Sequence, residues 1–501
     1  MREYEVTLNP NKLVRFLKKP ASEFTRHDII RFIEENGIEM VNFRFAGEDG
    51  KLKTLNFVIT SRDYLESILA TGERVDGSSL FSYVEAASSD LYVIPRFSTA
   101  FENPFSEIPS LDILCSYYTG EGKPLESAPE YILKKAHTEF KKSTGLVFKA
   151  MGELEFYIVA ESDQMYQPQD QKGYTNSMPF AKWEDLRKEA MNLMAQSGCK
   201  IKYGHSEVGN FSSKDKYFEQ HEIEFQPVDA EDAADQIIIA KWILRMLGHK
   251  HGVIISFAPK ITVGKAGSGL HIHMQLEKDG VNIMTDENSI SDTARKMIAG
   301  LLDKAKALTA FGNTVPLSYL RLVPHQEAPT NICWGDTNRS ALVRVPLGWI
   351  AKTNMVRDAN PFERYDVPYI PGKQTIELRT PDGSADIYHL LAGIIMAAQS
   401  GLEMENGLER AKELFVDVNI FKSENKQRAF ALEQLPVSCS QSADTLEKYR
   451  EFFERNNIFP KGTIDRFISQ LRSFKDEKLS EELFGKDDQI KLLVEKYLNH
   501  M

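Results

Sequence analysis

The chain has 501 residues, of which 42% are hydrophobic and 27% are charged, and its 72 acidic and 61 basic residues give a net charge of −11. This composition is typical of a globular protein and excludes a disordered, collagen-like or coiled-coil chain. The negative charge argues against nucleic acid as the main partner, because phosphate binding needs clustered lysine and arginine. The length suggests about three domains, or two of which one is large.

We expect residues 1–22 to be a lead-in segment. The pattern of residues 25–36 predicts a helix with Thr25 as its N-cap and Gly37 as its end, since threonine caps helix starts and glycine adopts the left-handed conformation that ends them. The first element of regular structure is therefore a short helix.

A β-hairpin follows this helix. Segments 40–45 and 51–58 alternate apolar and polar residues around a glycine-containing turn, as hairpin strands do. Residues 91–115 predict further strands, broken by prolines. Together these elements predict a small α+β domain over 23–118, and the polar stretch 119–124 marks its boundary.

The second domain is predicted to run from 125 to 501. We expect helices over about 127–143 with Ser127 as N-cap, over 229–251, and over 388–403. The last of these is apolar nearly all round, which predicts deep burial. From about residue 442 the chain reads as a polar, helical tail.

The cysteines and the start of the chain indicate where the protein works. Four scattered cysteines without a CxxC pair predict buried thiols in a reducing compartment rather than disulfides or a zinc site. The charged start resembles no signal peptide. The longest apolar stretch, 390–398, falls far short of the ~20 residues of a membrane span. These features predict a cytoplasmic protein with no membrane partner.

Four short strands carry ionisable side chains two positions apart, so each pair shares one face while apolar residues occupy the other. The pairs are Glu153 and Glu155, Glu222 and Glu224, His271 and His273, and Glu377 and Arg379. One such strand is also consistent with a solvated sheet face, but lysine, which is common on such faces, is absent from all four. Crowded carboxylates favour neutralisation by cations. A glutamate-rich set with histidine favours Mg²⁺ or Mn²⁺ over zinc or copper.

Four arginines complement these carboxylates: Arg321, Arg339, Arg344 and Arg379. Carboxylates that hold divalent cations, opposed by guanidinium groups, are what phosphoryl transfer needs. The sequence has no GxxxxGK[ST] motif and no kinase glycine loop, so a nucleotide would be held through metals and arginines. The glycines at 267 and 269 fit either a close backbone approach to a ligand or an ordinary tight turn.

A set of short motifs follows one another over about residues 35–405. They are DGSS at 76–79, GELEF at 152–156, HSEV at 205–208, QHEIEF at 220–225, FAPK at 257–260, GSGLHIH at 267–273, YLRLVP at 319–324, EAP at 327–329, NRSALVRVP at 338–346 and IELRTPD at 376–382. In these motifs and their order the chain resembles the type I glutamine synthetases of bacteria and archaea.

The resemblance implies an α+β fold, with an N-terminal β-grasp domain and a large C-terminal catalytic domain built on a curved antiparallel sheet with helices. It also implies a ring-forming homo-dodecamer with each active site between neighbouring subunits. The implied activity is that of an ATP-dependent ligase, which forms glutamine from L-glutamate and ammonia through a γ-glutamyl phosphate. The implied cofactors are two or more Mg²⁺ or Mn²⁺ ions per active site, with ATP as co-substrate.

The family's functional residues carry over to the matching positions. The implied metal ligands are Glu155, Glu207 and Glu222 at one site and Glu153, His271 and Glu377 at the other. The implied contacts to glutamate are Arg321, Arg379 and the backbone of Gly267, and those to ATP are Arg339, Arg344 and His273. The implied ammonium pocket comprises Asp76, Ser79, Tyr174, Glu207 and Glu327. Asp76 would be donated across the subunit interface and take a proton from ammonium, and Glu327 on a flap would shield the acyl phosphate from water.

Several positions depart from the family pattern. Ala266 replaces the usual asparagine before Gly-Ser-Gly, and Thr375 replaces an arginine. We expect a loop inserted at about 210–217 and a longer insertion at 348–373. Two alternatives therefore stay open: a γ-glutamyl-amine ligase for polyamines or monoamines, and a non-catalytic scaffold or sensor.

Four side chains near the motifs are expected to have structural roles. The family pattern does not use Glu224 and His273 as metal ligands, which predicts supporting roles for both. His205 and His221 are predicted to be polar packing rather than ligands.

Overall fold

The computed structural model describes residues 6–82, 89–163, 165–262, 264–286, 289–323, 328–348, 355–365, 372–483 and 486–498. The N-terminal part forms one mixed sheet in the order β2-β1-β6-β4-β3, with β5 paired to β6. Its strands are β1 (Met40–Ala46), β2 (Leu52–Val58), β3 (Glu73–Asp76), β4 (Asp90–Pro95), β5 (Phe101–Glu102) and β6 (Ser110–Thr119). β1 pairs with β2 as the predicted hairpin and runs parallel to β6.

The helices with described bounds in this N-terminal part are α2 (Lys12–Leu17), α3 (Arg26–Asn36) and α4 (Arg62–Thr71). The side chain of Thr25 forms a capping box with Asp28, and Gly37 ends α3 at φ 64°, which confirms both predicted ends of this helix. α2 falls inside the segment expected to be a lead-in, and its Leu13 is fully buried in the N-terminal core. The domain limits 23–118 and 125–501 stay a prediction.

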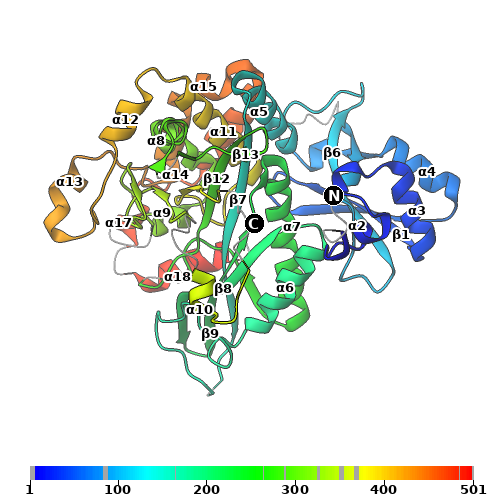
Figure 1. Cartoon of the computed structure of the whole chain (residues 1–501), viewed down its shortest axis with the longest axis horizontal. Coiled ribbons are helices and arrows are strands. Elements are labelled where there is room, and N and C mark those ends of the chain that lie inside the picture. Colours follow the sequence, from blue (N-terminus) through cyan, green and yellow to red (C-terminus); the bar gives the residue numbers. More distant parts are fainter. Residues whose placement is uncertain are drawn as a thin grey trace.

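A second, ten-stranded sheet runs through the rest of the molecule in the order β16-β17-β18-β12-β7-β9-β8 (Figure 1). Its main strands are β7 (Val147–Glu161), β8 (Ile201–Ser213), β9 (Lys216–Phe225), β12 (Leu270–Lys278), β16 (Trp334–Asp336), β17 (Val343–Val345) and β18 (Ile376–Leu378). Short strands β10 (Val228–Asp229) and β11 (Ile254–Ser256) pair with β7, and β13 (Val281–Asn282) pairs with β12. β14 (Thr285–Asp286) and β15 (Ser289–Ile290) form a separate two-stranded sheet. The predicted α+β fold is confirmed.

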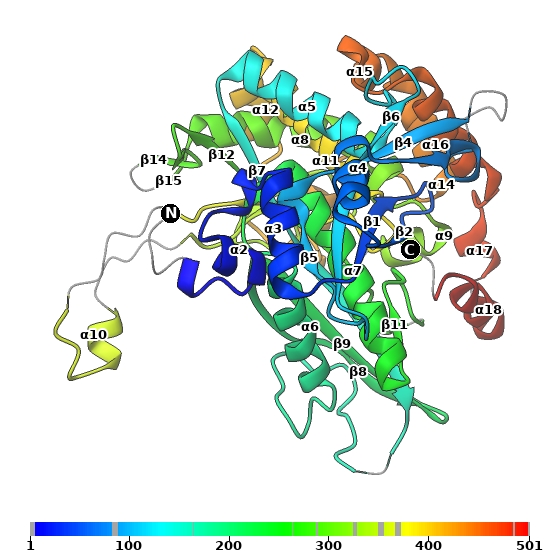
Figure 2. The ribbon, with the colours of Figure 1, turned by 90° about the vertical axis from the view of Figure 1, so that its right-hand side faces the viewer.

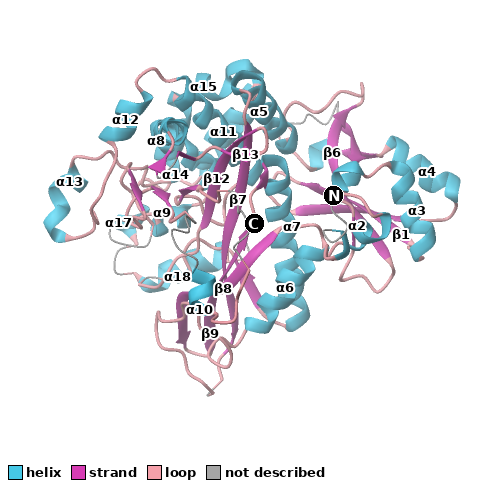
Figure 3. Ribbon diagram, in the orientation of Figure 1, coloured by secondary structure: helices cyan, strands magenta, loops and turns pink. Residues whose placement is uncertain are grey.

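Long helices pack against this sheet and against one another (Figure 3). They are α5 (Pro129–Thr144), α6 (Glu184–Gln196), α7 (Ala230–His251), α8 (Asp292–Gly312), α11 (Ile387–Glu403), α14 (Cys439–Lys448) and α16 (Lys461–Ser473). Shorter helices are α9 (Pro316–Arg321), α10 (Met355–Ala359), α12 (Gly407–Glu413), α13 (Lys426–Phe430), α15 (Arg450–Glu454), α17 (Leu479–Glu482) and α18 (Asp487–Tyr497). The deep burial predicted for 388–403 is confirmed, because α11 lies in the main hydrophobic core.

The contact between α8 and α11 depends on two glycines. A Cβ on Gly300 would lie 2.1 Å from the carbonyl oxygen of Ala397, and one on Gly401 would lie 2.1 Å from that of Lys296. The two helix backbones touch directly, and a larger side chain at either glycine would force them apart.

Two local predictions were wrong. The N-cap of α5 is Ala128, with Pro129 in the first turn, rather than Ser127. Proline fits the first helical turn because it needs no hydrogen bond from its own nitrogen, so it set the helix start one residue later.

The second wrong prediction is the inserted loop at about 210–217, which is instead the end of the β8–β9 hairpin (Figure 2). The strands continue because this segment carries aromatic residues that find partners: Phe211 stacks on Phe218 with ring centroids 4.6 Å apart, and Tyr217 is buried. Phe211 also joins a third hydrophobic cluster with Ile490 and Val494 of α18.

The four cysteines are buried and have free thiols, as predicted. The predicted helical tail forms, but its helices are not uniformly polar, because Leu446, Phe467 and Leu471 lie in the main core. No helix in the part of the chain that the structure describes is long and apolar enough to cross a membrane.

Glu130 at the start of α5 leads to a pH-dependent prediction. Burial raises the pKa of Glu130 from 4.5 to about 7. Between these two pH values the folded protein binds more protons than the unfolded chain, so stability falls as pH rises through this window. Glu130→Gln should therefore be more stable than wild type by about 1–2 kcal/mol at pH 8, with the gain shrinking toward pH 5. Urea unfolding at both pH values checks this, and an equal gain at both would contradict it.

Candidate active site

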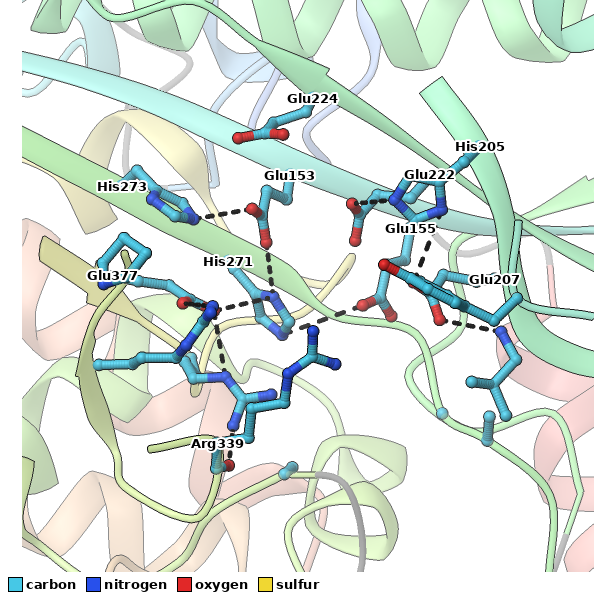
Figure 4. A pocket seen from close by; sticks show the side chains of 18 of the residues that line it. Glu153, Glu155, His205, Glu207, Glu222, Glu224, His271, His273, Arg339 and Glu377 are labelled. Carbon is cyan, nitrogen blue, oxygen red and sulfur yellow. Dashed lines mark hydrogen bonds and ion pairs between the residues drawn. The ribbon is translucent and has the colours of Figure 1, made fainter. Parts of the chain in front are cut away.

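The ionisable faces of the four predicted strands meet in one cavity of about 750 Å³. Figure 4 shows the carboxylates and imidazoles pointing toward one another across it. The predicted site residues that line the cavity are Glu153, Glu155, Tyr174, Glu207, Glu222, Gly267, His271, His273, Arg321, Arg339, Arg344, Glu377 and Arg379. The prediction that each of these strands carries its ionisable pair on one face is confirmed, and the structure joins the four faces in one cavity.

Strand register explains this meeting. On neighbouring strands Glu153 lies opposite His271, and Glu155 lies opposite Glu222. His273 lies opposite Glu377. Because side chains at paired positions of a sheet point to the same face, the register turns four separate spacings into one cluster. The intervening side chains, such as Leu154 and Ile272, are buried in the main core and fix which face is outward.

Glu153 lies at the centre of one group. One of its carboxylate oxygens is 3.0 Å from Nδ1 of His271, and the other is 2.8 Å from Nε2 of His273. Nδ1 of His271 is also 3.5 Å from Glu377. His273 in turn contacts the hydroxyl of Thr375 at 2.9 Å, so Thr375 helps to hold this histidine in place.

A second group lies on the other side of β7. Nε2 of His205 is 3.2 Å from Glu222, and Nδ1 of His205 is 3.7 Å from Glu207. Glu155 accepts a hydrogen bond of 2.6 Å from the backbone N–H of Gly269. Among the residues that the structure describes, three sets of potential ligand atoms lie within 4.8 Å of one another: Glu153 with His273 and Glu377, Glu153 with Glu222 and His271, and His205 with Glu207 and Glu222.

The carboxylates are crowded enough to resist ionising together. Burial, followed by the charges of Glu153, Glu155, Glu207 and Glu224, raises the pKa of Glu222 well above its ordinary value. Burial also acts to raise the pKa of Glu153, but His273 and His271 outweigh it, and the pKa of Glu153 is well below its ordinary value.

The residues present fit hard divalent cations. Most of the donor atoms in these three sets are carboxylate oxygens, and histidine nitrogens are the remainder. Such a donor set suits Mg²⁺ or Mn²⁺.

Arginines form the opposite wall. Arg344 and Arg379 each contact Glu377, at 2.8 and 3.1 Å. Arg379 also donates to the backbone oxygen of Arg339. Arg321 donates to the carbonyl of Thr380 at 2.8 Å, which ties the end of α9 to the end of β18. The wall therefore presents several fixed guanidinium groups to a bound anion.

At the glycine turn 267–269 the backbone lies close against the side chains of Arg321 and His271. A Cβ on Gly269 would lie 2.5 Å from Nη2 of Arg321 and 2.8 Å from Nε2 of His271, and one on Gly267 would lie 3.0 Å from Cγ of Arg321. Gly267 lines the cavity, and its carbonyl oxygen accepts a hydrogen bond from Gln220 at 2.9 Å.

Gly269→Ala is expected to displace Arg321 and His271 without unfolding the protein. A shift of about 1 Å in side chains that position a substrate lowers catalytic efficiency by about 10–100-fold. We expect most of the loss as a higher KM for the substrate that contacts Arg321, measured by steady-state kinetics. Gly462→Ala, where a Cβ meets nothing within 4 Å, is the control and should leave activity unchanged.

Asp76 and Ser79 do not line the cavity of their own chain. Asp76 ends β3, and Ser79 lies in the 3-10 turn η2 (Gly77–Ser79). Hydrogen bonds from Ser78, Ser79 and Ser89 lower the pKa of Asp76 to about 2, so this exposed carboxylate stays ionised at neutral pH. Glu327 lies outside the described residues.

Sequence reasoning missed part of the site. His205, expected to be packing, lies between Glu207 and Glu222. Its position two residues before Glu207 on β8 was the available signal, because it places both on one face. His221 is packing as predicted: it is fully buried, with one ring nitrogen 2.8 Å from Glu219 and the other 2.7 Å from Arg187. Lys202 and Tyr203 also line the cavity, without a motif that marks them, and Lys260 at the end of the FAPK motif lines it too.

Comparison with known proteins places this fold and site in one class. Residues 37–120 match the family model of the glutamine synthetase beta-Grasp domain, and residues 126–481 match that of the glutamine synthetase catalytic domain. The chain belongs to the glutamine synthetase family.

Individual relatives, similar in sequence or in structure, agree with this family assignment. The glutamine synthetase of Clostridium saccharobutylicum is 31% identical over 437 residues, covering 85% of this chain and 90% of the relative. That of Pyrococcus horikoshii is 32% identical over 425 residues, covering 84% and 87%. The Plasmodium falciparum glutamine synthetase structure aligns with a TM-score of 0.73 at 22% identity, covering 91% and 97%. A structure of GmaS without ligand aligns with a TM-score of 0.68 at 21% identity, covering 91% and 96%.

Proposed function

We propose that this protein is an ATP-dependent ligase that forms glutamine from L-glutamate and ammonia through a γ-glutamyl phosphate. The observation that carries the proposal is the register-matched cluster of glutamates and histidines on four strands, opposed by arginines across one cavity. A carboxylate and an amine do not condense unaided in water, and phosphorylation of the carboxylate supplies a leaving group.

The metal ligands in this proposal are Glu155, Glu207 and Glu222 at one site and Glu153, His271 and Glu377 at the other, with His205 beside the first. The bound Mg²⁺ or Mn²⁺ ions would neutralise phosphate charge and polarise the phosphoryl oxygens.

The arginines and the backbone position the reactants. Arg321, Arg379 and the Gly267 carbonyl would hold the carboxylate and amino groups of glutamate. Arg339 and Arg344 would stabilise the negative charge that moves during phosphoryl transfer, with His273 on the ATP side. Tyr174, about half exposed and in edge contact with His205 at 5.2 Å, would line the acceptor side.

Asp76 and Ser79 would complete the acceptor pocket of a neighbouring subunit. Their placement away from their own cavity supports a shared site, and we extend this to a ring-forming dodecamer in the cytoplasm. The ionised Asp76 carboxylate would attract ammonium and take its proton, and Glu327 would shield the acyl phosphate from water.

A γ-glutamyl-amine ligase is the second candidate. It is favoured by Ala266, whose methyl group stands beside Gly267 where the family generally has asparagine. The smaller side chain leaves room near the glutamate end of the cavity. A non-catalytic scaffold or sensor is not favoured, because every expected metal ligand is present.

Phosphate release from the purified protein tests these candidates. The assay contains ATP, Mg²⁺ and L-glutamate, with ammonium, methylamine, ethanolamine, putrescine or spermidine added in turn. We expect ammonium-dependent turnover and glutamine by mass spectrometry. Turnover with an organic amine alone would assign the second candidate. If no acceptor gave phosphate release while Mg²⁺ binding was intact, both candidate functions would be overturned.

A further inference from the structure

A second cleft, of about 490 Å³, lies between the N-terminal part and the catalytic part of the chain, away from the active-site cavity. The β1–β2 hairpin, the C-terminal half of α7 and β11 form its walls, and Figure 1 shows α7 between the N-terminal sheet and β7. Four of its lining residues are basic: Lys51, Lys241, Arg245 and His249. No aspartate or glutamate is among the described residues that line it.

The two inner cations are poorly neutralised. Lys241 is only 5% exposed, and its ammonium donates to the backbone oxygen of Gly383 at 2.8 Å. Arg245 is half-buried and has no hydrogen bond or ion pair within the described part of the chain, although the charge of Asp49 acts on it. Both cations lie over the ring of Phe257, at 5.6 and 5.1 Å from its centroid. A cation–π contact offsets only part of the cost of removing a cation from water.

Nearby acids have partners of their own. Asp49 pairs with Lys53 at 2.7 Å, Asp382 accepts from Asn313 at 2.7 Å, and Asp386 lies 2.8 Å from His389. Burial, followed by the charge of Arg245, lowers the pKa of Lys241 to about 7, although the charges of Asp382 and Asp386 act to raise it. Burial also lowers the pKa of Arg245 to about 10. Positive charge is therefore held in this cleft at a free-energy cost.

We propose that the cleft is a binding site for a small anion carrying a phosphate or carboxylate group, held between Arg245 and Lys241. The guanidinium of Arg245 offers the paired donors that bind such oxygens in a two-point contact. Lys51 and His249 at the exposed rim add charge that attracts the anion. The apolar walls, which include Ile238, Trp242 and Ile255, and a volume in the usual range for ligand sites, suit a small organic anion.

The cleft also has a direct connection to the active site, and this part of the inference rests on the proposed function. Lys241 binds the carbonyl of Gly383, in the segment that follows Arg379. The adjacent Asp382 pairs with Gly269 through the backbone, opposite the cavity's glycine turn. An anion that keeps Lys241 protonated would strengthen its bond to Gly383 and so hold this segment in place. The site would then regulate glutamate binding.

Anion-induced thermal stabilisation tests the site without using activity. The melting temperature of the full-length protein is measured against increasing inorganic phosphate and, separately, citrate, at constant ionic strength. Wild type, Arg245→Gln, Arg245→Lys and the control Arg26→Gln, an exposed arginine on α3, are compared. Anions that bind the active site act on all four proteins, so the difference between them isolates the cleft.

We expect at least one anion to bind wild type and Arg26→Gln alike, and Arg245→Gln about 10-fold more weakly, because one charge-assisted pair is lost. Arg245→Lys, which keeps the charge, should be intermediate. A response to phosphate alone identifies a phosphate compound as the ligand, and a response to citrate alone a carboxylate. Equal responses of wild type and Arg245→Gln to both anions, with both proteins folded, would overturn the proposal whether or not the ligase is active.

Discussion

Glu222→Gln is expected to lower ligase activity by at least about 10³-fold. The change removes a carboxylate ligand of the metal ion that would stabilise the negative charge of the phosphoryl group during its transfer. The same change should leave the metal-free protein as stable as wild type or more stable. Burial and the negative charges of Glu153, Glu155 and Glu207 raise the pKa of Glu222, which means that its ionised form is unfavourable in the folded protein. An uncharged amide at this position has no such repulsion with the neighbouring carboxylates. Thermal unfolding with and without Mg²⁺, together with glutamine formation, measures both effects.

Glu224→Gln is the matched control, two residues along the same strand and on the same face. The carboxylate of Glu224 already has a cationic partner, Lys202, at 2.5 Å. We expect Glu224→Gln to keep most of the Mg²⁺-induced stabilisation that Glu222→Gln loses. Loss of stability in metal-free Glu222→Gln, or an unchanged response to Mg²⁺, would contradict the assignment of Glu222 as a metal ligand.

Asp235→Asn is expected to cost about 3–5 kcal/mol of folding stability, since breaking a buried ion pair leaves the other charge unpaired. Asp235 on α7 is 5% exposed and binds both terminal nitrogens of Arg96, at 2.6 and 3.0 Å. The hydroxyl of Tyr388 donates to the same carboxylate at 2.7 Å. This cluster joins the N-terminal sheet to two helices of the catalytic part.

Tyr388→Phe is the variant with which the stability loss of Asp235→Asn is compared. It removes one hydrogen bond to Asp235 and keeps the ion pair, so it should cost only about 1–2 kcal/mol. Guanidinium-induced unfolding of both variants, followed by the fluorescence of the four tryptophans, gives the two values. A smaller loss in Asp235→Asn than in Tyr388→Phe would mean that the ion pair contributes little to holding the two parts together.

The sequence alone determined the local features of this protein. The capping of α3 by Thr25 and Gly37 depends on neighbours a few residues away. The spacing that puts Glu153 and Glu155 on one face depends on the period of a strand, and the motifs were specific enough to place the chain in its family.

Only the tertiary structure decided what these features contact. His205 became part of the site because β8 pairs with β9 in a register that sets it opposite Glu222. The segment 210–217 became a hairpin because Phe211 stacks on Phe218 and shares a hydrophobic cluster with Ile490 and Val494 of α18, nearly 300 residues further along the chain. The unbalanced charges of Lys241 and Arg245 arise where the N-terminal hairpin approaches α7. Pairing, burial and the electrostatic cost of unpartnered charge depend on neighbours in space, and local sequence patterns do not specify those neighbours.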